Sequence, residues 1–337
     1  MRISIFLLIL VVVLLIIIAG GLFMITQPFV QAYNSLPTTV DSGRLEKHVR
    51  YLSEDLYPRS YEHLRNINLA AQYILDEFKT TGGEVKVQSY EVQGNTYKNI
   101  VVRFGPSSGP VMVIGAHYDS VGFAFTDSNG SPGFSPETHT PGADDNASGV
   151  AGLIELARLL GQAQQKRAIE LVAYTLEEPP FFRTPQMGSA RHAHSMRASN
   201  QEVEFMLSLE MIGYFTDVPG SQAYPVPGMK RLYPDRGNFI ALVGKMSDFG
   251  ATRRIKATMA SATDLPVHSI NAPPILQGVD FSDHLNYWNE GYPAFMITDT
   301  AFLRNANYHL AGDTYEKLDY ERMAKVVLAV YAVTQQL

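Results

Sequence analysis

The N-terminal segment constrains this chain most, because residues 3–25 carry no charge and are almost entirely apolar. As an α-helix rising roughly 1.5 Å per residue, a run of this length crosses a hydrocarbon core of about 30 Å. A cleavable signal peptide has a shorter apolar core, of about 7–15 residues, although Ala19, Gly20 and Gly21 resemble the small residues before a cleavage site. We therefore predict a transmembrane anchor over residues 1–26, with cleavage as the alternative.

The charges around this segment predict its orientation. Arg2 and the terminal amine precede it, whereas the next charged residues, Asp41 and Arg44, lie well beyond its end. Because positive flanking charges tend to stay in the cytoplasm, we predict a single-pass membrane protein with a cytoplasmic N-terminus. The rest of the chain is then extracytoplasmic, in the periplasm or at the cell surface. Residues 27–42, which contain two prolines, are interpreted as a linker.

Composition excludes several classes of protein. The 27 basic and 33 acidic residues give a net charge of −6, and there is no long basic run, so we expect no nucleic-acid partner. The chain has no cysteine, which excludes disulfides, thiol nucleophiles and thiolate metal ligands. Any metal ion must therefore be held by histidine and carboxylate side chains.

Residues 43–337 alternate between helical and β patterns, and we predict that they form one catalytic domain. The predicted fold class is α/β, with a mixed, mainly parallel β-sheet sandwiched by helices. Amphipathic helices are expected near residues 64–78, 150–160 and 323–330, and strands at 84–91, 97–104, 111–114, 169–174, 205–209 and 294–297. Two long loops, residues 122–141 and 179–187, follow strand ends. Because open α/β sheets bind ligands at the carboxyl ends of their strands, we expect both loops to rim a site.

Histidine and carboxylate residues stand at the ends of the predicted strands. His117 and Asp119 close an apolar strand, and residues i and i+2 of an extended segment point the same way. Asp119 can thus hold one ring nitrogen of His117 while the other nitrogen binds a metal ion. Asp144 and Asp145 precede a helix, where capping explains one aspartate but not two. Two adjacent carboxylates repel each other unless a cation lies beside them.

Three further positions continue the pattern. Glu177 and Glu178 follow a buried strand, and such a pair allows one glutamate to bind a metal ion while the other acts as a base. Glu210 ends an otherwise apolar strand, where a buried carboxylate needs a cation. His309 lies shortly before the last helix. Together these residues predict a site for zinc or another divalent ion, with Asp145 as a bridge between two ions about 3.5–4 Å apart.

The same segments resemble a known family. The motifs occur in the family's order at residues 115–121, 142–149, 177–178 with 188–189, 209–214 and 308–320. The family is that of the co-catalytic di-zinc exopeptidases, which includes secreted bacterial leucyl aminopeptidases, plasma glutamate carboxypeptidase and the glutaminyl cyclases. The resemblance runs from about Arg44 to the C-terminus. It implies a zinc aminopeptidase-like fold and the hydrolysis of a terminal peptide bond.

The resemblance also implies the metal ligands. One zinc ion would be held by His117, Asp145 and Glu210, and a second by Asp145, Glu178 and His309. The chain is therefore expected to bind two Zn2+ ions. Glu210 stands where many members have aspartate, and its longer side chain is expected to shift one ion or its affinity.

Three catalytic roles are implied as well. Glu177 would be the general base, Asp119 would orient His117, and Tyr308 would stabilise the tetrahedral intermediate. The family often has a cis peptide after the bridging aspartate, which here is the bond from Asp145 to Asn146.

Several activities stay open at this stage, and we expect an aminopeptidase acting on peptide substrates first, because that is the family's usual activity. Arg304 keeps a carboxypeptidase open, since a guanidinium pairs well with a terminal carboxylate. Glutaminyl cyclases keep much of the ligand set but favour several tryptophans, and Trp288 is the only tryptophan here. A non-catalytic receptor of the same fold typically loses ligands that this chain retains. The sequence makes no prediction about oligomeric state.

Four remaining polar residues receive weaker interpretations. Asp283 and His284 are expected to begin a helix, with support of the metal site as an alternative role. His192 and His194 are interpreted as ordinary residues of a helix surface.

Overall fold

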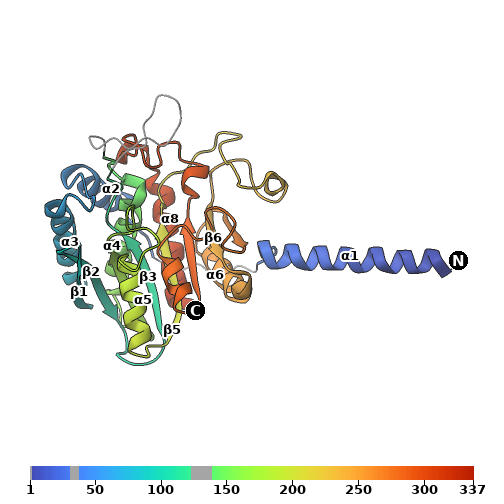
Figure 1. The fold of residues 1–337 in the computed structure, drawn as a ribbon, viewed down its shortest axis with the longest axis horizontal. Coiled ribbons are helices and arrows are strands. Elements are labelled where there is room, and N and C mark those ends of the chain that lie inside the picture. Colours follow the sequence, from blue (N-terminus) through green and yellow to red (C-terminus); the bar gives the residue numbers. More distant parts are fainter. Residues whose placement is uncertain (1, 31–37, 123–138) are drawn as a thin grey trace.

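The structure is a computed structural model that describes residues 2–30, 38–122 and 139–337. Part of the predicted linker, residues 31–37, and most of the predicted loop at 122–141, residues 123–138, lie outside the described residues. Helix α1 (Arg2–Thr26) extends away from one side of the domain (Figure 1), and none of its stretch Ile9–Thr26 is buried. A core helix of a globular domain would be buried, so α1 has the exposure expected of a membrane anchor or a signal sequence.

Within the described part of the chain, eight strands form one mixed sheet. They are β1 (Glu84–Val92), β2 (Asn95–Phe104), β3 (Val111–His117), β4 (Ala168–Tyr174), β5 (Val203–Glu210), β6 (Ile240–Gly244), β7 (Val267–Asn271) and β8 (Ala294–Thr298). Their order across the sheet is β1-β2-β4-β3-β5-β8-β6-β7. The central strands β4, β3, β5 and β8 are parallel, and β7 is parallel to β6. The pairs β1 with β2, β2 with β4, and β6 with β8 are antiparallel.

Helices cover both faces of this sheet. They are α2 (Ser42–Arg50), α3 (Leu64–Lys79), α4 (Gly149–Leu160), α5 (Gly188–Ala198), α6 (Phe249–Ala262), α7 (His284–Asn289) and α8 (Tyr320–Gln336). A large apolar core joins one face of the sheet to α2, α3, α4, α6 and α8, and a second core joins the other face to α5 and α7. Because both faces are covered, β3 and β4 bury every residue, and apart from His117 and Glu170 their sequences are apolar without alternation. The predicted α/β sandwich is confirmed.

Short helical turns complete the described chain. They are η1 (Tyr51–Asp55), η2 (Ala143–Ser148), η3 (Pro227–Arg231), η4 (Met246–Asp248), η5 (Ala301–Leu303) and η6 (Tyr315–Lys317). Helix α7 begins directly after Asp283, as expected. The sequence-based prediction lacks α2, and it also lacks β6, β7 and α6. The two strands have only five residues each, and α6 buries mostly alanine and threonine, so all three have weak periodic signals.

The parallel strands gather the polar strand ends at one edge of the sheet. His117 is the last residue of β3, and Glu210 is the last residue of β5. Glu177 and Glu178 follow the end of β4 after a short turn. Because β4, β3 and β5 are neighbours that run in the same direction, these side chains are brought to the same end of the sheet.

Candidate metal centre

The predicted metal ligands converge at this edge. Among the described residues, three overlapping groups of histidine and carboxylate side chains have ligand atoms that all lie within 4.8 Å of one another. The groups are His117 with Asp145 and Glu210, His117 with Glu177 and Glu178, and Asp145 with Glu178 and His309. Two of these groups are the two ligand sets expected from the family resemblance. All six side chains are buried or nearly buried.

Asp145 lies between the two histidines. Its Oδ1 is 3.3 Å from Nε2 of His117, and its Oδ2 is 3.1 Å from Nε2 of His309. The first histidine also lies 3.4 Å from Oε2 of Glu210, and the second lies 3.4 Å from Oε2 of Glu178. One carboxylate therefore faces both halves of the site, which is the arrangement of a bridging ligand.

A tight turn places Asp145 in this position. Gly142 has a φ of 62°, in the left-handed region, and a Cβ atom there would lie 2.3 Å from the carbonyl oxygen of Asp145. Glycine is therefore required before η2. The peptide bond between Asp145 and Asn146 is cis, as expected. The Asn146 amide then donates to the carbonyl of Leu209 at 2.8 Å, which joins this turn to the end of β5.

The carboxylates make the site strongly negative. Burial lowers the pKa of His117, but the charges of Glu177 and Glu210 outweigh burial and raise that pKa well above its usual range. Burial likewise opposes the charged form of His309, but the carboxylates of Glu178 and Asp145 raise its pKa to about 10. Burial raises the pKa of Glu178 to about 7, and the charge of Asp145 adds to that effect. The negative potential of the site therefore favours the binding of positive charge.

Asp119 supports the pair of glutamates as well as His117. Its two carboxylate oxygens accept hydrogen bonds from the backbone N–H groups of Glu177 (3.2 Å) and Glu178 (3.1 Å). Nδ1 of His117 lies 3.1 Å from the backbone carbonyl of Asp119 and 3.6 Å from its Oδ1. The expected orienting contact therefore involves mainly the Asp119 backbone, and the Asp119 side chain fixes the segment that carries Glu177.

Asp313 holds the Asp145 turn from the other side, and it received no role from the sequence. Its Oδ1 accepts from the N–H of Asp144 and its Oδ2 from the N–H of Asp145, both at 3.0 Å. The signal available in the sequence was an aspartate four residues after His309, which resembles an ordinary helix-proximal acid. Glu210 is held differently, by the hydroxyl of Ser282 at 2.7 Å.

Asp283 and His284 were given support of the metal site as an alternative role, and the structure shows the contacts that each one makes. His284 has Nε2 2.8 Å from the carbonyl of Val279, so it ties its own loop together. Asp283 is fully buried near the site, and burial raises its pKa to about 7.

The interpretation of His192 as a surface residue was wrong. His192 is buried, with Nε2 3.0 Å from Glu170 and Nδ1 2.6 Å from the hydroxyl of Tyr287. Tyr287 belongs to α7, which covers the face of α5 that carries His192. His194 is exposed, as expected.

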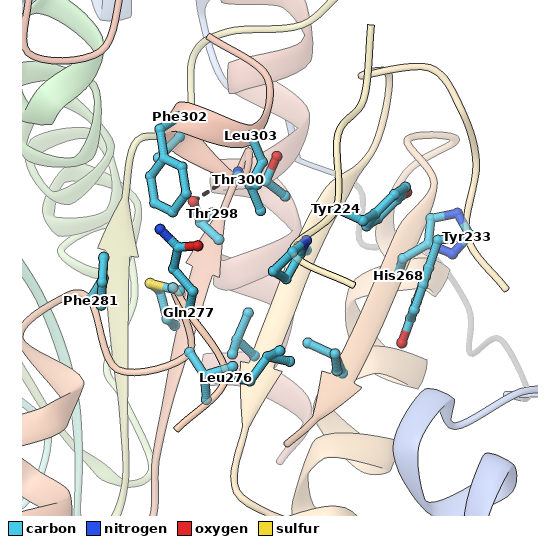
Figure 2. A pocket seen from close by; sticks show the side chains of 18 of the residues that line it. Tyr224, Tyr233, His268, Leu276, Gln277, Phe281, Thr298, Thr300, Phe302 and Leu303 are labelled. Atoms are coloured by element: carbon cyan, nitrogen blue, oxygen red, sulfur yellow. Dashed lines mark hydrogen bonds between the residues drawn. The ribbon is translucent and has the colours of Figure 1, made fainter. Parts of the chain in front are cut away.

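An apolar cavity opens beside the candidate ligands (Figure 2). Glu210 and Tyr308 line the cavity as well as the site. Its other walls come from β6, β7 and β8, from the segment between β5 and β6, and from the loops that follow β7 and β8. They include the side chains labelled in Figure 2, such as Phe281, Phe302 and Leu303. Among the described residues that line the cavity there is no lysine or arginine. The cavity therefore suits an apolar group next to the metal centre.

Arg304 is not among those lining residues. Its Nε donates to Oε1 of Gln222 at 2.9 Å, and its Nη1 donates to the carbonyl of Tyr214 at 3.3 Å. Its guanidinium also lies over the rings of Phe215 and Phe239. Arg304 is therefore a buried structural residue in this fold.

The donor set fits zinc. Nε2 of His117 and Oε1 of Glu178 are buried and have no hydrogen-bond partner within the described chain, although both belong to the close ligand groups. A buried polar atom without a partner is costly unless a ligand satisfies it. Imidazole and carboxylate donors without sulfur suit zinc and similar divalent ions.

Comparisons with known proteins agree with this geometry. A protein of Escherichia coli K12, named uncharacterized protein YfbL, is 51% identical over 306 residues, which cover 91% of each chain. Leucine aminopeptidase 1 of Grosmannia clavigera is 24% identical over 313 residues, covering 87% of this chain and 68% of that protein.

Two solved structures from Bacteroides thetaiotaomicron share the fold. A leucine aminopeptidase precursor has a TM-score of 0.67 at 18% identity and covers 90% of this chain and 99% of its own. A glutaminyl cyclase bound to N-acetylhistamine has a TM-score of 0.67 at 17% identity and covers 89% of this chain and 99% of its own.

The family comparison covers most of the domain. Residues 99–334 match peptidase family M28, and this range contains every predicted site residue. The match confirms the resemblance to the zinc exopeptidases and the interpretation of the chain as a metallo-exopeptidase. The chain therefore belongs to peptidase family M28.

Proposed function

We propose that this protein is a membrane-anchored aminopeptidase that uses two zinc ions to remove an N-terminal residue with an apolar side chain. The observation that carries the proposal is Asp145, whose two oxygens face His117 and His309 at 3.3 and 3.1 Å. His117, Asp145 and Glu210 would hold one ion, and Asp145, Glu178 and His309 the other.

Zinc ions held there would act as Lewis acids that polarise the scissile carbonyl and lower the pKa of a water molecule. Glu177 would take the proton from that water and return it to the leaving amine. Its carboxylate lies 3.8 Å from Nε2 of His117, at the edge of the ligand groups. Burial and the charges of Glu210 and Glu178 raise the pKa of Glu177, so this carboxylate binds a proton readily.

Tyr308 would donate a hydrogen bond to the oxyanion that develops on the carbonyl. Its ring stacks on that of His309 with centroids 3.8 Å apart, and it lines the apolar cavity. Burial, together with the charges of Asp145 and Glu178, raises the pKa of Tyr308 well above its usual value. The phenol therefore stays protonated and is available as a donor.

The cavity supports an aminopeptidase over a carboxypeptidase. A carboxypeptidase needs a cation for the terminal carboxylate, and the described lining has none, while Arg304 is engaged by Gln222 and Tyr214. Trp288, the only tryptophan, donates its indole N–H to the carbonyl of Ala294 and does not line the cavity, which gives no support to a cyclase.

We further propose that α1 crosses the membrane once and keeps the domain on the extracytoplasmic side. Its length, its lack of charge between residues 3 and 25, and its exposure support a span. Arg2, on the N-terminal side, supports the orientation.

A panel of blocked peptides tests the activity. With the purified full-length protein and zinc, we expect hydrolysis of Leu-Gly-Gly and of its C-terminal amide, and no hydrolysis of its N-acetyl form. Cleavage of the acetylated peptide but not of the amide would instead show a carboxypeptidase. Conversion of Gln-Gly-Gly to pyroglutamyl-Gly-Gly with release of ammonia, and with both peptide bonds intact, would show a cyclase.

A further inference from the structure

Side chains of the domain form hydrogen bonds with the C-terminal end of α1. The carbonyl of Thr26 accepts hydrogen bonds from Nζ of Lys256 (2.8 Å) and from the hydroxyl of Ser269 (3.0 Å). The carbonyl of Gln27, a fully buried residue, accepts a second bond from Lys256 at 3.0 Å. The last carbonyls of a helix lack partners within the helix and favour cations, so this contact suits a helix end.

Arg253 extends this contact to the next two residues of the chain. Its Nη1 and Nη2 donate to the carbonyls of Pro28 (2.8 Å) and Phe29 (2.9 Å), and its guanidinium lies 4.9 Å from the centroid of the Phe23 ring. Two cations of α6 therefore fix the direction in which α1 leaves the domain. Where α1 spans a bilayer, the face of the domain that is turned toward that bilayer is then fixed as well.

A loop projects from that face. We define the juxtamembrane loop as residues 225–233, which include η3 and project toward the side from which α1 leaves (Figure 1). Its base adjoins the end of the anchor, because the Tyr233 hydroxyl donates to the carbonyl of Ser269 at 2.8 Å. Ser269 is also the residue whose hydroxyl binds Thr26. One residue of β7 thus contacts both the loop and the anchor.

The surface of the juxtamembrane loop combines apolar and basic side chains. Val226 and Leu232 are 45% and 47% exposed. Lys230 and Arg231 are exposed, and neither forms an ion pair with a described residue, although the chain as a whole is acidic. Aliphatic side chains beside unpaired cations are the combination that binds the interface of an anionic bilayer.

We propose that the juxtamembrane loop rests on the anionic headgroups of the bilayer that α1 crosses and forms a second membrane contact. The proposal rests on the proposed anchor and is independent of the proposed peptidase activity. The inner side of the same loop sends Met229 and Tyr233 into the apolar cavity. The membrane contact therefore places one wall of the candidate substrate pocket at the lipid surface.

Single-cysteine labelling of the full-length chain tests this contact, because the chain has no native cysteine. A Leu232→Cys variant carries an NBD label and is reconstituted in phosphatidylcholine vesicles that contain phosphatidylglycerol and a lipid with a TEMPO headgroup. The control is Ser107→Cys, an exposed position between β2 and β3. We expect quenching at position 232 at least about threefold stronger than at position 107, and a clear loss of that difference without phosphatidylglycerol.

Charge reversal separates lipid binding from mere proximity. Lys230→Glu with Arg231→Glu should reduce the quenching at position 232 toward the level at position 107. Lys47→Glu with Arg65→Glu changes two exposed cations on α2 and α3 and should leave the quenching unchanged.

Four outcomes overturn the proposal. Equal quenching at positions 232 and 107 contradicts the lipid contact. Quenching at position 232 that is the same with and without phosphatidylglycerol contradicts it as well. Cross-linking between two copies through position 232 without quenching shows that a second chain covers the loop. Absence of the protein from floated vesicles contradicts the membrane anchor on which the proposal rests. Peptide hydrolysis, measured in detergent, tests the proposed peptidase activity separately.

Discussion

Oδ2 of Asp313 accepts the backbone N–H of Asp145 at 3.0 Å, so the residue that faces both histidines is itself held by a second buried acid. The other oxygen of Asp313 accepts the N–H of Asp144. Asp119 makes the same kind of contact with Glu177 and Glu178. Each of the two acidic pairs is thus fixed through its backbone by an aspartate from elsewhere in the chain.

Replacing Asp313 tests this support. Asp313→Asn turns one acceptor into a donor that faces a backbone N–H, so the Asp145 turn should lose its fixed position. We expect zinc affinity to fall about 10–100-fold, as is usual when the partner that orients a ligand is lost. Competition with a chromogenic chelator measures the affinity, and excess zinc should restore part of the activity. Asp264→Asn, at an exposed position, is the control; unchanged affinity in Asp313→Asn contradicts the role.

The adjacent glutamates should separate into a base and a ligand. Glu177→Gln should keep both zinc ions and lower kcat by at least about 100-fold, because general-base catalysis is worth this much. Glu178→Gln should lose zinc, since this side chain belongs to the ligand group around His309. Metal analysis and peptide hydrolysis of the two variants give the comparison. Near-normal turnover in Glu177→Gln would remove that residue from the chemistry.

The number of ions can be tested at His309. Chelation of the purified protein should abolish peptide hydrolysis, and zinc should restore it with a stoichiometry near two ions per chain. His309→Gln should reduce the stoichiometry to one, because His117, Asp145 and Glu210 stay intact. His194→Gln, at a 75% exposed side chain, should bind as the parent does. A parent protein that saturates at one ion contradicts the bridging role of Asp145.

The dependence of stability on pH should include a contribution from Glu155, which lies on α4 and is not among the candidate ligands. Burial raises the pKa of Glu155, but the nearby His48 ring (3.7 Å) and the hydrogen bonds from Arg44 and Arg158 outweigh burial and lower that pKa to about 2. A carboxyl group with a lowered folded-state pKa stabilises the protein above its unfolded value of 4.5, and this stabilisation is lost as the pH falls through about 2.

The variant Glu155→Gln isolates this contribution. At neutral pH it should lower the free energy of unfolding by about 2 kcal/mol, less than the full shift at 1.36 kcal/mol per pKa unit, because Arg44 is partly exposed. The difference from the parent should narrow between pH 4.5 and 2, as measured by denaturant unfolding at several pH values. A difference that stays constant over that range argues for a packing effect instead.

The sequence predicted the centre of the fold well, for a physical reason. His117 and Glu210 each interrupt an apolar pattern at the last residue of a strand, and Glu178 follows shortly after the end of β4. A polar side chain at such a position needs an explanation. Parallel strands then bring these ends together without any further information. The central sheet and the convergence of the candidate ligands were predictable for this reason.

Contacts between distant segments were harder to predict. The burial of His192 depends on Tyr287, which lies 95 residues away on a helix of only six residues. From the sequence alone, Arg304 was a candidate for binding the terminal carboxylate of a carboxypeptidase substrate. In the structure its guanidinium is bound by Gln222, which lies 82 residues away in the sequence. The contact of Lys256 with the end of α1 joins residues 230 positions apart. Such partners leave no local pattern in the sequence.

The seam between α1 and the domain consists largely of main-chain oxygens on one side and of cationic side chains on the other. Every residue type has a backbone carbonyl. Substitutions at Thr26, Pro28 and Phe29 should therefore be tolerated as long as the backbone conformation is unchanged. Lys256 and Arg253 have less freedom, since each contact needs a long side chain that ends in a hydrogen-bond donor. Where α1 anchors the chain in a membrane, natural selection on the orientation of the domain should therefore act on helix α6 more strongly than on the C-terminal end of α1.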